Sequence, residues 1–418
     1  MKLGGLLPVC LLPALLYRIS YVTLGLSGGS RRRMAERSPA RQPAGASVGP
    51  VSPRNGGSRV KRVMFRPAAM TTLVAVIVVA GAPAAAAQPL CDKSEIRLVN
   101  SMREIAQPYH ANLDKGGRWF AAWAGIKHYV LQLNQGDSDK QISLMRLLVA
   151  TNARCTVFNV EPNADLVIKP MVDVANQSGA WIVTHWAHNE GLHPFDGNDH
   201  WIAHVAVDSM EAGVAISRLL VDAMGRKGGV VALQGRLDTD PARKRFAGFQ
   251  QVLRDTPGVK LLDQQTANWD RTAAFPIMQT WLAKYGSQIN GVWAANDDMA
   301  LGALEALRAA GLAGKIPVVG VDGIPEAIAA VEKGEMISTV SSDAFYQGSI
   351  GLAMGTCILT GQTPLPATWS KEEREFYLKL AVITRDNAAQ YLREPEPSAY
   401  AADWQCDKLW SRSTGKAF

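Results

Sequence analysis

The chain has 418 residues, which is enough for two domains, and a formal net charge of +7. Residues 1–87 hold 12 of the 44 Lys and Arg residues but one of the 37 acidic residues. Residues 88–418 therefore carry 32 basic and 36 acidic side chains and are mildly acidic. This balance gives no reason to expect nucleic-acid binding by the folded part.

The first 87 residues are typical of an export signal behind a leader. Residues 1–60 contain a broken apolar stretch and then a run rich in Arg, Pro, Gly and Ser, so we interpret them as a disordered or spurious leader. Residues 61–87 combine basic residues, an apolar run and a small-residue end, which predicts a signal peptide cleaved before Gln88. A transmembrane anchor is the alternative, but the apolar run is shorter than the roughly 20 residues that a span needs. We expect the protein in the periplasm.

Short apolar runs alternate with helical periods from Glu95 onward. Strands are expected at 96–101, 128–134, 155–160, 181–186, 204–208, 228–235, 260–267, 291–296, 317–323 and 336–342. Helices are expected at 112–125, 138–151, 209–225, 241–255, 272–285, 298–310 and 324–333. This alternation predicts parallel sheets with helices on both faces. Ten strands exceed one ordinary sheet, so we predict two α/β domains.

Four cysteines follow the expected cleavage site: Cys91, Cys155, Cys357 and Cys406. In an exported chain they permit two disulfides in three possible pairings, and isolated buried thiols are the alternative. Their spacing does not suggest zinc.

Aromatic and polar residues gather where the predicted strands end, which is where parallel sheets bind ligands. Asn296 is the last residue of one strand, and we expect it to contact a ligand while Asp297 or Asp298 caps the next helix. Aromatic faces stack on sugar rings, and amide, acid and guanidinium groups bind hydroxyls, so the pattern predicts a pocket for a small neutral polyol. The other candidates are Tyr109, His110, Glu161, His185, Trp186, Arg243, Trp269 and Asp322.

Five histidines lie between positions 185 and 204, with acidic residues among them. Their spacings match no metal-ligand motif, so we predict a solvated loop in which His185 alone faces the cleft, and no metal. Residues 88–418 have no G-x-S-x-G elbow, no phosphate-binding G-x-x-x-x-G-K-[ST] loop and no G-x-G-x-x-G after the first expected strand. We therefore predict neither an enzyme nor a cofactor.

Several segments resemble periplasmic sugar-binding proteins of the ribose-binding type, namely "AANDDMALGALEALRAAGLAGKIPVVGVDG", "DPARKRFAGFQ", "TANWDR" and "YLKLAVITRDN". The resemblance runs from about residue 95 to 387 and leaves out the tail beyond 388. It implies two Rossmann-like lobes, residues 88–207 plus 343–377 and residues 208–342 plus 378–418. Three crossing segments would form a hinge near Val207-Asp208, Ser342-Asp343 and Tyr377-Leu378.

The same resemblance implies sugar contacts at Tyr109, Arg243, Trp269, Asn296 and Asp322, with the sugar sandwiched between Trp269 and the aromatic at Tyr109. It also implies a monomer that delivers a small sugar or polyol to the permease of an ABC transporter with a cytoplasmic ATPase. A periplasmic receptor that presents its ligand to a sensor kinase or chemoreceptor is the alternative.

Four positions depart from the family pattern. His185-Trp186 replace an Asp-Arg pair, Glu161 replaces an Asn, and Ser342 replaces a Gln at the hinge. These changes favour another polyol, a modified sugar or a cationic ligand over ribose itself.

Overall fold

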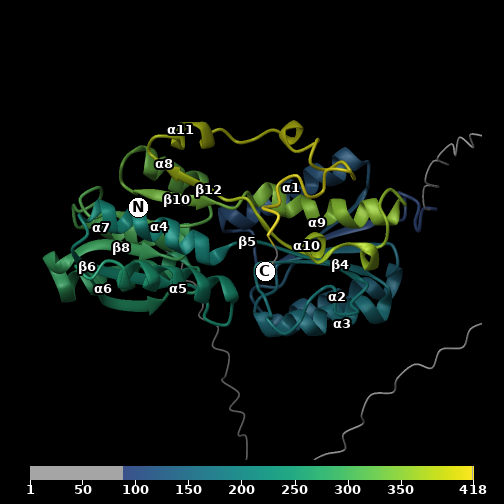
Figure 1. Ribbon diagram of the computed structural model, residues 1–418, viewed down its shortest axis with the longest axis horizontal. Helices are drawn as coiled ribbons and strands as arrows, with labels where there is room; N and C mark the ends of the chain where they lie inside the picture. The colour runs from purple at the N-terminus through teal and green to yellow at the C-terminus, as the bar shows by residue number, and fades with distance from the viewer. Residues whose placement is uncertain (1–87, 417) are drawn as a thin grey trace, which may run out of the picture. The chain divides into compact units, whose positions relative to one another are not determined.

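The computed structural model describes residues 88–416 and 418, so the expected leader and signal peptide lie outside the described residues. Two six-stranded sheets organise this part of the chain (Figure 1), with strand orders β11-β5-β4-β3-β1-β2 and β12-β10-β9-β8-β6-β7. No helix among the described residues is long and apolar enough to cross a membrane. The fold is the expected α/β pair of lobes.

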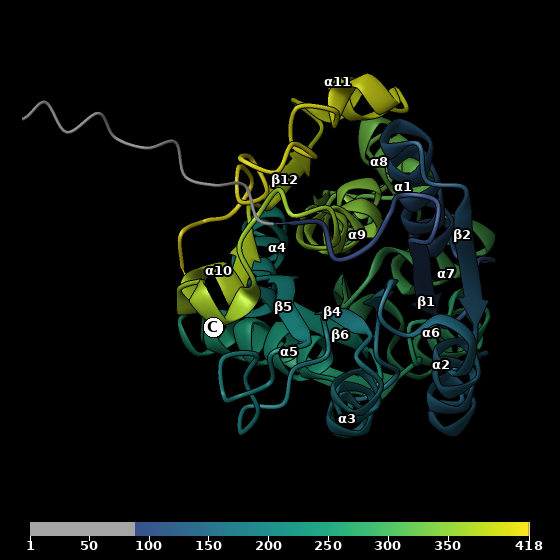
Figure 2. The same ribbon diagram turned by 90° about the vertical axis from the view of Figure 1, so that its right-hand side faces the viewer.

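The first lobe is built on a sheet whose recorded pairings are all parallel. Helices α1 and α9 pack together, as do α2 and α3, and Figure 2 shows these pairs on opposite sides of the sheet. Every residue of β3, β4 and β5 is buried, as expected for strands covered on both faces. The elements are β1 (Arg97–Met102), α1 (Pro108–Ala124), β2 (His128–Leu133), α2 (Ser138–Asn152), β3 (Thr156–Val160), α3 (Ile168–Ser178), β4 (Trp181–His185), β5 (Trp201–Val207), α9 (Ala344–Leu359), α10 (Lys371–Arg374) and β11 (Glu375–Leu378).

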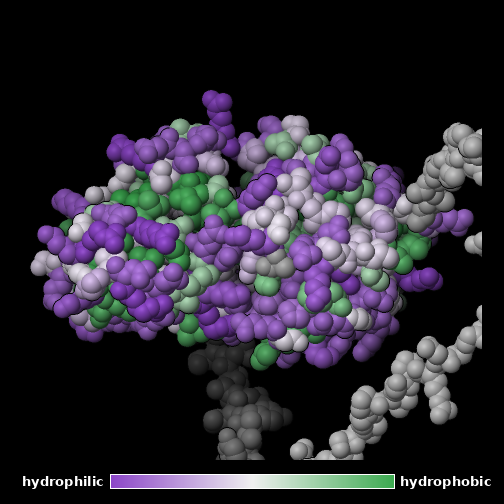
Figure 3. All heavy atoms as spheres, viewed as in Figure 1, coloured by the Kyte–Doolittle hydropathy of each residue, from purple (hydrophilic) through white to green (hydrophobic). Residues whose placement is uncertain are grey.

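The second lobe has the same plan, with α4 packed on α5 and α6 on α7. Its edge strand β12 is the exception, because it pairs antiparallel with β10. On the face viewed in Figure 3 hydrophobic side chains gather over this lobe among mainly hydrophilic ones. The elements are α4 (Ser209–Ala223), β6 (Gly228–Gln234), α5 (Asp240–Arg254), β7 (Val259–Thr266), α6 (Arg271–Tyr285), β8 (Ile289–Ala294), α7 (Asp297–Ala309), β9 (Val318–Val319), α8 (Pro325–Glu332), β10 (Ser338–Ser341), β12 (Ala381–Thr384) and α11 (Ala388–Tyr391).

The chain passes between the two sheets three times. It leaves the first sheet after Val207, returns after Ser341 through α9, and leaves again between Leu378 and Ala381. We call these three crossing segments the hinge.

The C-terminal tail differs from our assignment of residues 378–418 to the second lobe. In Figure 1 it runs from α11, beside α8, across to α1 of the first lobe. Trp404 there packs 5.7 Å from the ring of Phe120, and its indole N–H donates to Ser349 Oγ at 2.8 Å. The chain after α11 therefore packs on the first lobe, where Tyr400 and Trp404 are buried, while β12 and α11 pack in the second lobe.

Two disulfides resolve the three possible pairings. Cys91 is bonded to Cys155, and Cys357 is bonded to Cys406. The second bond attaches the tail to α9 of the first lobe.

Candidate ligand-binding site

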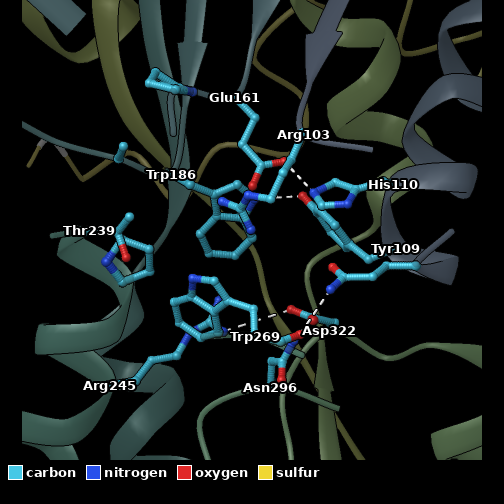
Figure 4. A pocket seen from close by; sticks show the side chains of 14 residues that line it. Arg103, Tyr109, His110, Glu161, Trp186, Thr239, Arg245, Trp269, Asn296 and Asp322 are labelled. Atoms are coloured by element: carbon cyan, nitrogen blue, oxygen red, sulfur yellow. Dashed lines mark hydrogen bonds and ion pairs between the residues drawn. The ribbon is translucent and has the colours of Figure 1, made fainter. Parts of the chain in front are cut away.

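A cavity of about 50 Å³ lies where residues of both lobes meet beyond their strands (Figure 4). Arg103 follows β1, Glu161 follows β3 and Trp186 follows β4 in the first lobe, and Asn296 follows β8 in the second. Strand ends at one edge of a parallel sheet lie side by side, which brings these residues together. The remaining lining residues are Gln107, Tyr109, His110, Pro162, Ala187, Thr239, Pro241, Arg245, Trp269 and Asp322.

The two cavity tryptophans, one from each lobe, have unusual backbone conformations. Trp186 has φ of 63° and Trp269 has φ of 70°, in the left-handed region that costs a non-glycine residue about 1–3 kcal/mol. The Ala187 N–H donates to the His185 carbonyl at 2.8 Å, which closes a tight turn around Trp186. Trp269 lies so close to Gly235 that a Cβ there would come within 2.2 Å of its ring. The surrounding chain thus holds both indoles at the cavity.

Arg245 connects the two indoles. Its guanidinium carbon lies 4.9 Å from the ring centre of Trp186 and 5.5 Å from that of Trp269, within cation–π range. The side chain is buried, and Nη1 donates to the Ala295 carbonyl at 2.7 Å. Asp322 lies 3.8 Å away; burial raises the pKa of this carboxyl, and the positive charge of Arg245 opposes the rise.

His110 lies between two carboxylates on the first-lobe side. Nδ1 is 2.5 Å from Glu104 Oε1, and Nε2 is 2.9 Å from Glu161 Oε2. Burial would lower the pKa of His110, but the charge of Glu161 and the hydrogen bond to Glu104 raise it to about 9. Burial would likewise raise the pKa of Glu161, but His110 holds it at about 2. At neutral pH the imidazole is therefore positively charged and donates to both carboxylates.

The structure brings seven of the ten predicted site residues to the cavity and places three elsewhere. Those that line it are Tyr109, His110, Glu161, Trp186, Trp269, Asn296 and Asp322. His185, Arg243 and Ser342 do not line it.

Arg243 lies at the rim, where it joins the lobes. Its Nη2 is 2.6 Å from Asp165 Oδ2 of the first lobe, and the side chain is 47% exposed. Successive helical residues turn by about 100°, so Arg245, two positions along α5, faces nearly the opposite way and reaches the cavity. A second contact across the lobes runs from Gln107 Nε2 to the Trp269 carbonyl at 2.9 Å.

His185 and Ser342 point into the interior. His185 is the last residue of β4, and its Nε2 lies 2.5 Å from Asn159 Oδ1, whereas the left-handed turn at Trp186 brings the indole to the cavity. Burial lowers the pKa of His185 to about 4. Ser342 is buried at the hinge. The expected solvated histidine loop is also wrong, since His188 and His204 are buried.

Asn296 has the role that we had expected of the acids beside it. Its side chain accepts from the Met299 N–H at 3.0 Å and caps α7. Asp297 instead accepts from Thr339 Oγ1, and Asp298 is 3.0 Å from Arg271 Nη2. Asn296 still lines the cavity, and its Nδ2 makes a long 3.4 Å contact with the Trp269 carbonyl.

Sequence reasoning missed four polar residues of the cavity. Arg103 follows the first strand directly, so the strand-end rule could have found it. Arg245 could have been found only from the helical rotation of α5. Gln107 and Thr239 lie in connecting segments that carry no motif.

Residues 99–363 match the family described as "Periplasmic binding protein domain". The chain belongs to this family. Its members bind solutes and are not enzymes. A crystal structure of a twin-arginine translocation pathway signal protein from Burkholderia phytofirmans is similar with a TM-score of 0.73 and 38% identity, covering 78% of this chain and 99% of that one.

Two curated relatives are binding proteins for a polyol and a sugar. A xylitol-binding protein of Mycolicibacterium smegmatis is 40% identical over 159 residues, which is 38% of this chain and 45% of that protein. The chain thus aligns with under half the length of that relative. A ribose import binding protein of Haemophilus influenzae is 29% identical over 258 residues, 62% of this chain and 84% of that protein.

Proposed function

We propose that this protein is exported to the periplasm, captures a small neutral sugar or polyol between its lobes and delivers it to an ABC-type permease. The observation that carries the proposal is the cavity, where two indoles and a set of polar groups converge from both lobes. The xylitol and ribose specificities of the two relatives point to the same ligand class.

The charges of the cavity favour a neutral ligand. Among the described residues each cavity carboxylate has a cation beside it: His110 contacts Glu161, and Arg245 lies near Asp322. The positive charge of Arg103 also acts on Glu161. A charged ligand would have to displace one of these partners, and an unpaired buried charge is costly.

Hydroxyl groups suit the remaining features of the cavity. The Nδ2 of Asn296 makes only a long contact and can turn to a hydroxyl. The indole faces of Trp186 and Trp269 suit the C–H faces of a sugar. Each buried hydroxyl needs a partner, because leaving it unpaired costs about 1–3 kcal/mol.

Binding requires movement of the lobes or of the lining side chains. The cavity of about 50 Å³ is smaller than the roughly 300–1,000 Å³ of ordinary small-molecule pockets. The lobes touch through Arg243 and Gln107 at the rim. A ligand that contacts both lobes favours the closed arrangement by its greater affinity for that arrangement.

Calorimetric titration tests the ligand class. We expect xylitol or a related neutral polyol to bind, while glucosamine and gluconate, as cationic and anionic analogues, bind more weakly. Trp269→Ala is expected to lower affinity at least tenfold, about 1.4 kcal/mol. Trp123→Ala, an exposed tryptophan on α1, is the control and is expected to bind as the parent does. Tighter binding of either charged analogue would refute the neutral-ligand assignment.

Export and delivery have separate tests. N-terminal sequencing of the periplasmic protein is expected to begin near Gln88, and retention of residues 1–60 would contradict the signal-peptide assignment. Deleting the gene is expected to abolish uptake of the bound ligand by whole cells, and unchanged uptake would contradict delivery to a permease.

A further inference from the structure

A cluster of two histidines and one glutamate lies apart from the ligand cavity, beside the hinge. His188 Nε2 is 3.0 Å from Glu375 Oε1, and His193 Nδ1 is 2.8 Å from Glu375 Oε2. One donor atom from each residue can be chosen so that all three lie within 4.8 Å of one another. Neither histidine nor Glu375 lines the ligand cavity, so its ligand chemistry does not explain the cluster.

We propose that His188, His193 and Glu375 bind one divalent transition-metal cation of the zinc type. Zn²⁺ takes imidazole nitrogen and carboxylate oxygen at about 2.0–2.2 Å, and two histidines with one glutamate form a known three-ligand set that leaves a fourth position for water. Imidazole favours zinc, copper and nickel over Mg²⁺ and Ca²⁺, which prefer oxygen ligands.

The charge of the cluster supports a bound cation. Glu375 is 2% exposed, and its only ion-pair partners among the described residues are the two imidazoles. A buried carboxylate without a lysine or arginine partner is costly unless a cation or hydrogen bonds compensate it. A divalent ion would supply that charge.

The rings are held in place, and one of them gives access from solvent. His188 stacks on Phe418 with ring centres 4.9 Å apart, and His193 lies parallel to Phe195 at 4.9 Å. The backbone N–H of His188 also donates to Asp165 Oδ1 at 3.0 Å. His193 is 30% exposed, so an ion can enter from its side and keep water in the open position.

A metal ion at this cluster would link two segments of the first lobe. Glu375 is the first residue of strand β11, which leads into the hinge, while both histidines belong to the loop that follows Trp186. The ion would tie this loop to β11 and so stabilise the first lobe beside the ligand cavity. The proposal rests on the cluster alone and holds whatever solute the cavity binds.

Metal binding to the untagged protein, expressed from the full chain and treated with a chelator, tests the proposal. Calorimetric titration with ZnCl₂ is expected to show one ion per chain, and Zn²⁺ to raise the melting temperature where Mg²⁺ does not. Co²⁺ is expected to give the visible absorption of a four-coordinate site. Binding of no Zn²⁺ at micromolar concentrations would overturn the proposal and leave a purely hydrogen-bonded cluster.

Matched variants locate the ion. His193→Ala removes the most exposed ligand and is expected to abolish the stoichiometric binding while the protein still unfolds cooperatively. His128→Ala, an exposed histidine at the start of β2, is expected to bind Zn²⁺ unchanged. If His193→Ala fails to fold, His188→Gln replaces it with the same expectation. Stoichiometric binding that persists in a folded ligand variant would refute this assignment.

Discussion

The charged His110 gives the folded protein a stability that depends on pH. Its pKa of about 9 in the fold lies above the ordinary 6.5, because the effects of Glu161 and Glu104 exceed that of burial. The contribution is fully present below pH 6.5, declines as pH rises, and is lost above about pH 9. At about 1.36 kcal/mol per pH unit, the difference between 9 and 6.5 corresponds to roughly 3 kcal/mol.

Urea unfolding of ligand-free protein at pH 6.5 and at pH 9.5 measures this loss. His110→Gln keeps a polar side chain but cannot carry the charge. From pH 6.5 to pH 9.5 its free energy of unfolding is therefore expected to fall by roughly 3 kcal/mol less than that of the parent. Titrating groups that do not contact His110 are common to both proteins and cancel in the difference. His128→Gln, at an exposed histidine, is expected to follow the parent. Superimposable pH dependences of the parent and His110→Gln would refute the charged imidazole.

Three further substitutions separate the roles assigned above. Arg245→Ala is expected to lower the affinity for the polyol at least tenfold by calorimetry. Arg243→Ala breaks a half-exposed ion pair between the lobes and is expected to lower the affinity only about two- to fivefold. Equal losses of affinity would contradict the assignment of Arg245 to the cavity. Asn296→Ala is expected to lower stability by about 1 kcal/mol through loss of the α7 cap and also to weaken binding, so a binding loss without a stability loss would contradict the cap. Replacing Cys357 and Cys406 together by serine is expected to lower the free energy of unfolding by about 4 kcal/mol, because the bond closes a loop of 49 residues; an unchanged urea midpoint would contradict this.

The alternation of apolar runs and helical periods located most of the fold. All ten expected strands occur as β1 to β10, although 317–323 shortens to Val318–Val319. Strands β11 and β12 flank the third hinge segment and have four residues each, too few to show an alternation. Helix α9 is buried around nearly its whole circumference, so it lacks the polar face that marks an amphipathic helix.

The strand-end rule predicted where the site lies but not how each side chain points. The apolar pattern shows which runs form buried strands and where each strand ends, so Asn296 and Glu161 could be predicted. The direction in which a side chain points around a helix cannot be read from that pattern. Arg243 was therefore predicted as the ligand contact, whereas Arg245 lines the cavity. The turn around Trp186 depends on contacts with distant segments, which a single sequence does not reveal.

The hydrogen bonds of Tyr109 explain how a hinge residue bears on the cavity without lining it. The Trp186 indole N–H donates to Tyr109 at 2.5 Å, and the Tyr109 hydroxyl donates to Gln347 Oε1 at 3.2 Å. Gln347 in turn donates to the Ser342 carbonyl at 2.6 Å, where the chain crosses between the lobes. The hinge position is thus connected to the cavity through its backbone, because the Ser342 hydroxyl itself has no partner among the described residues. Because Gln347 contacts the backbone carbonyl, this hydrogen bond does not depend on which side chain stands at position 342. The serine there is therefore compatible with the hydrogen bonds that hold the Trp186 indole at the cavity.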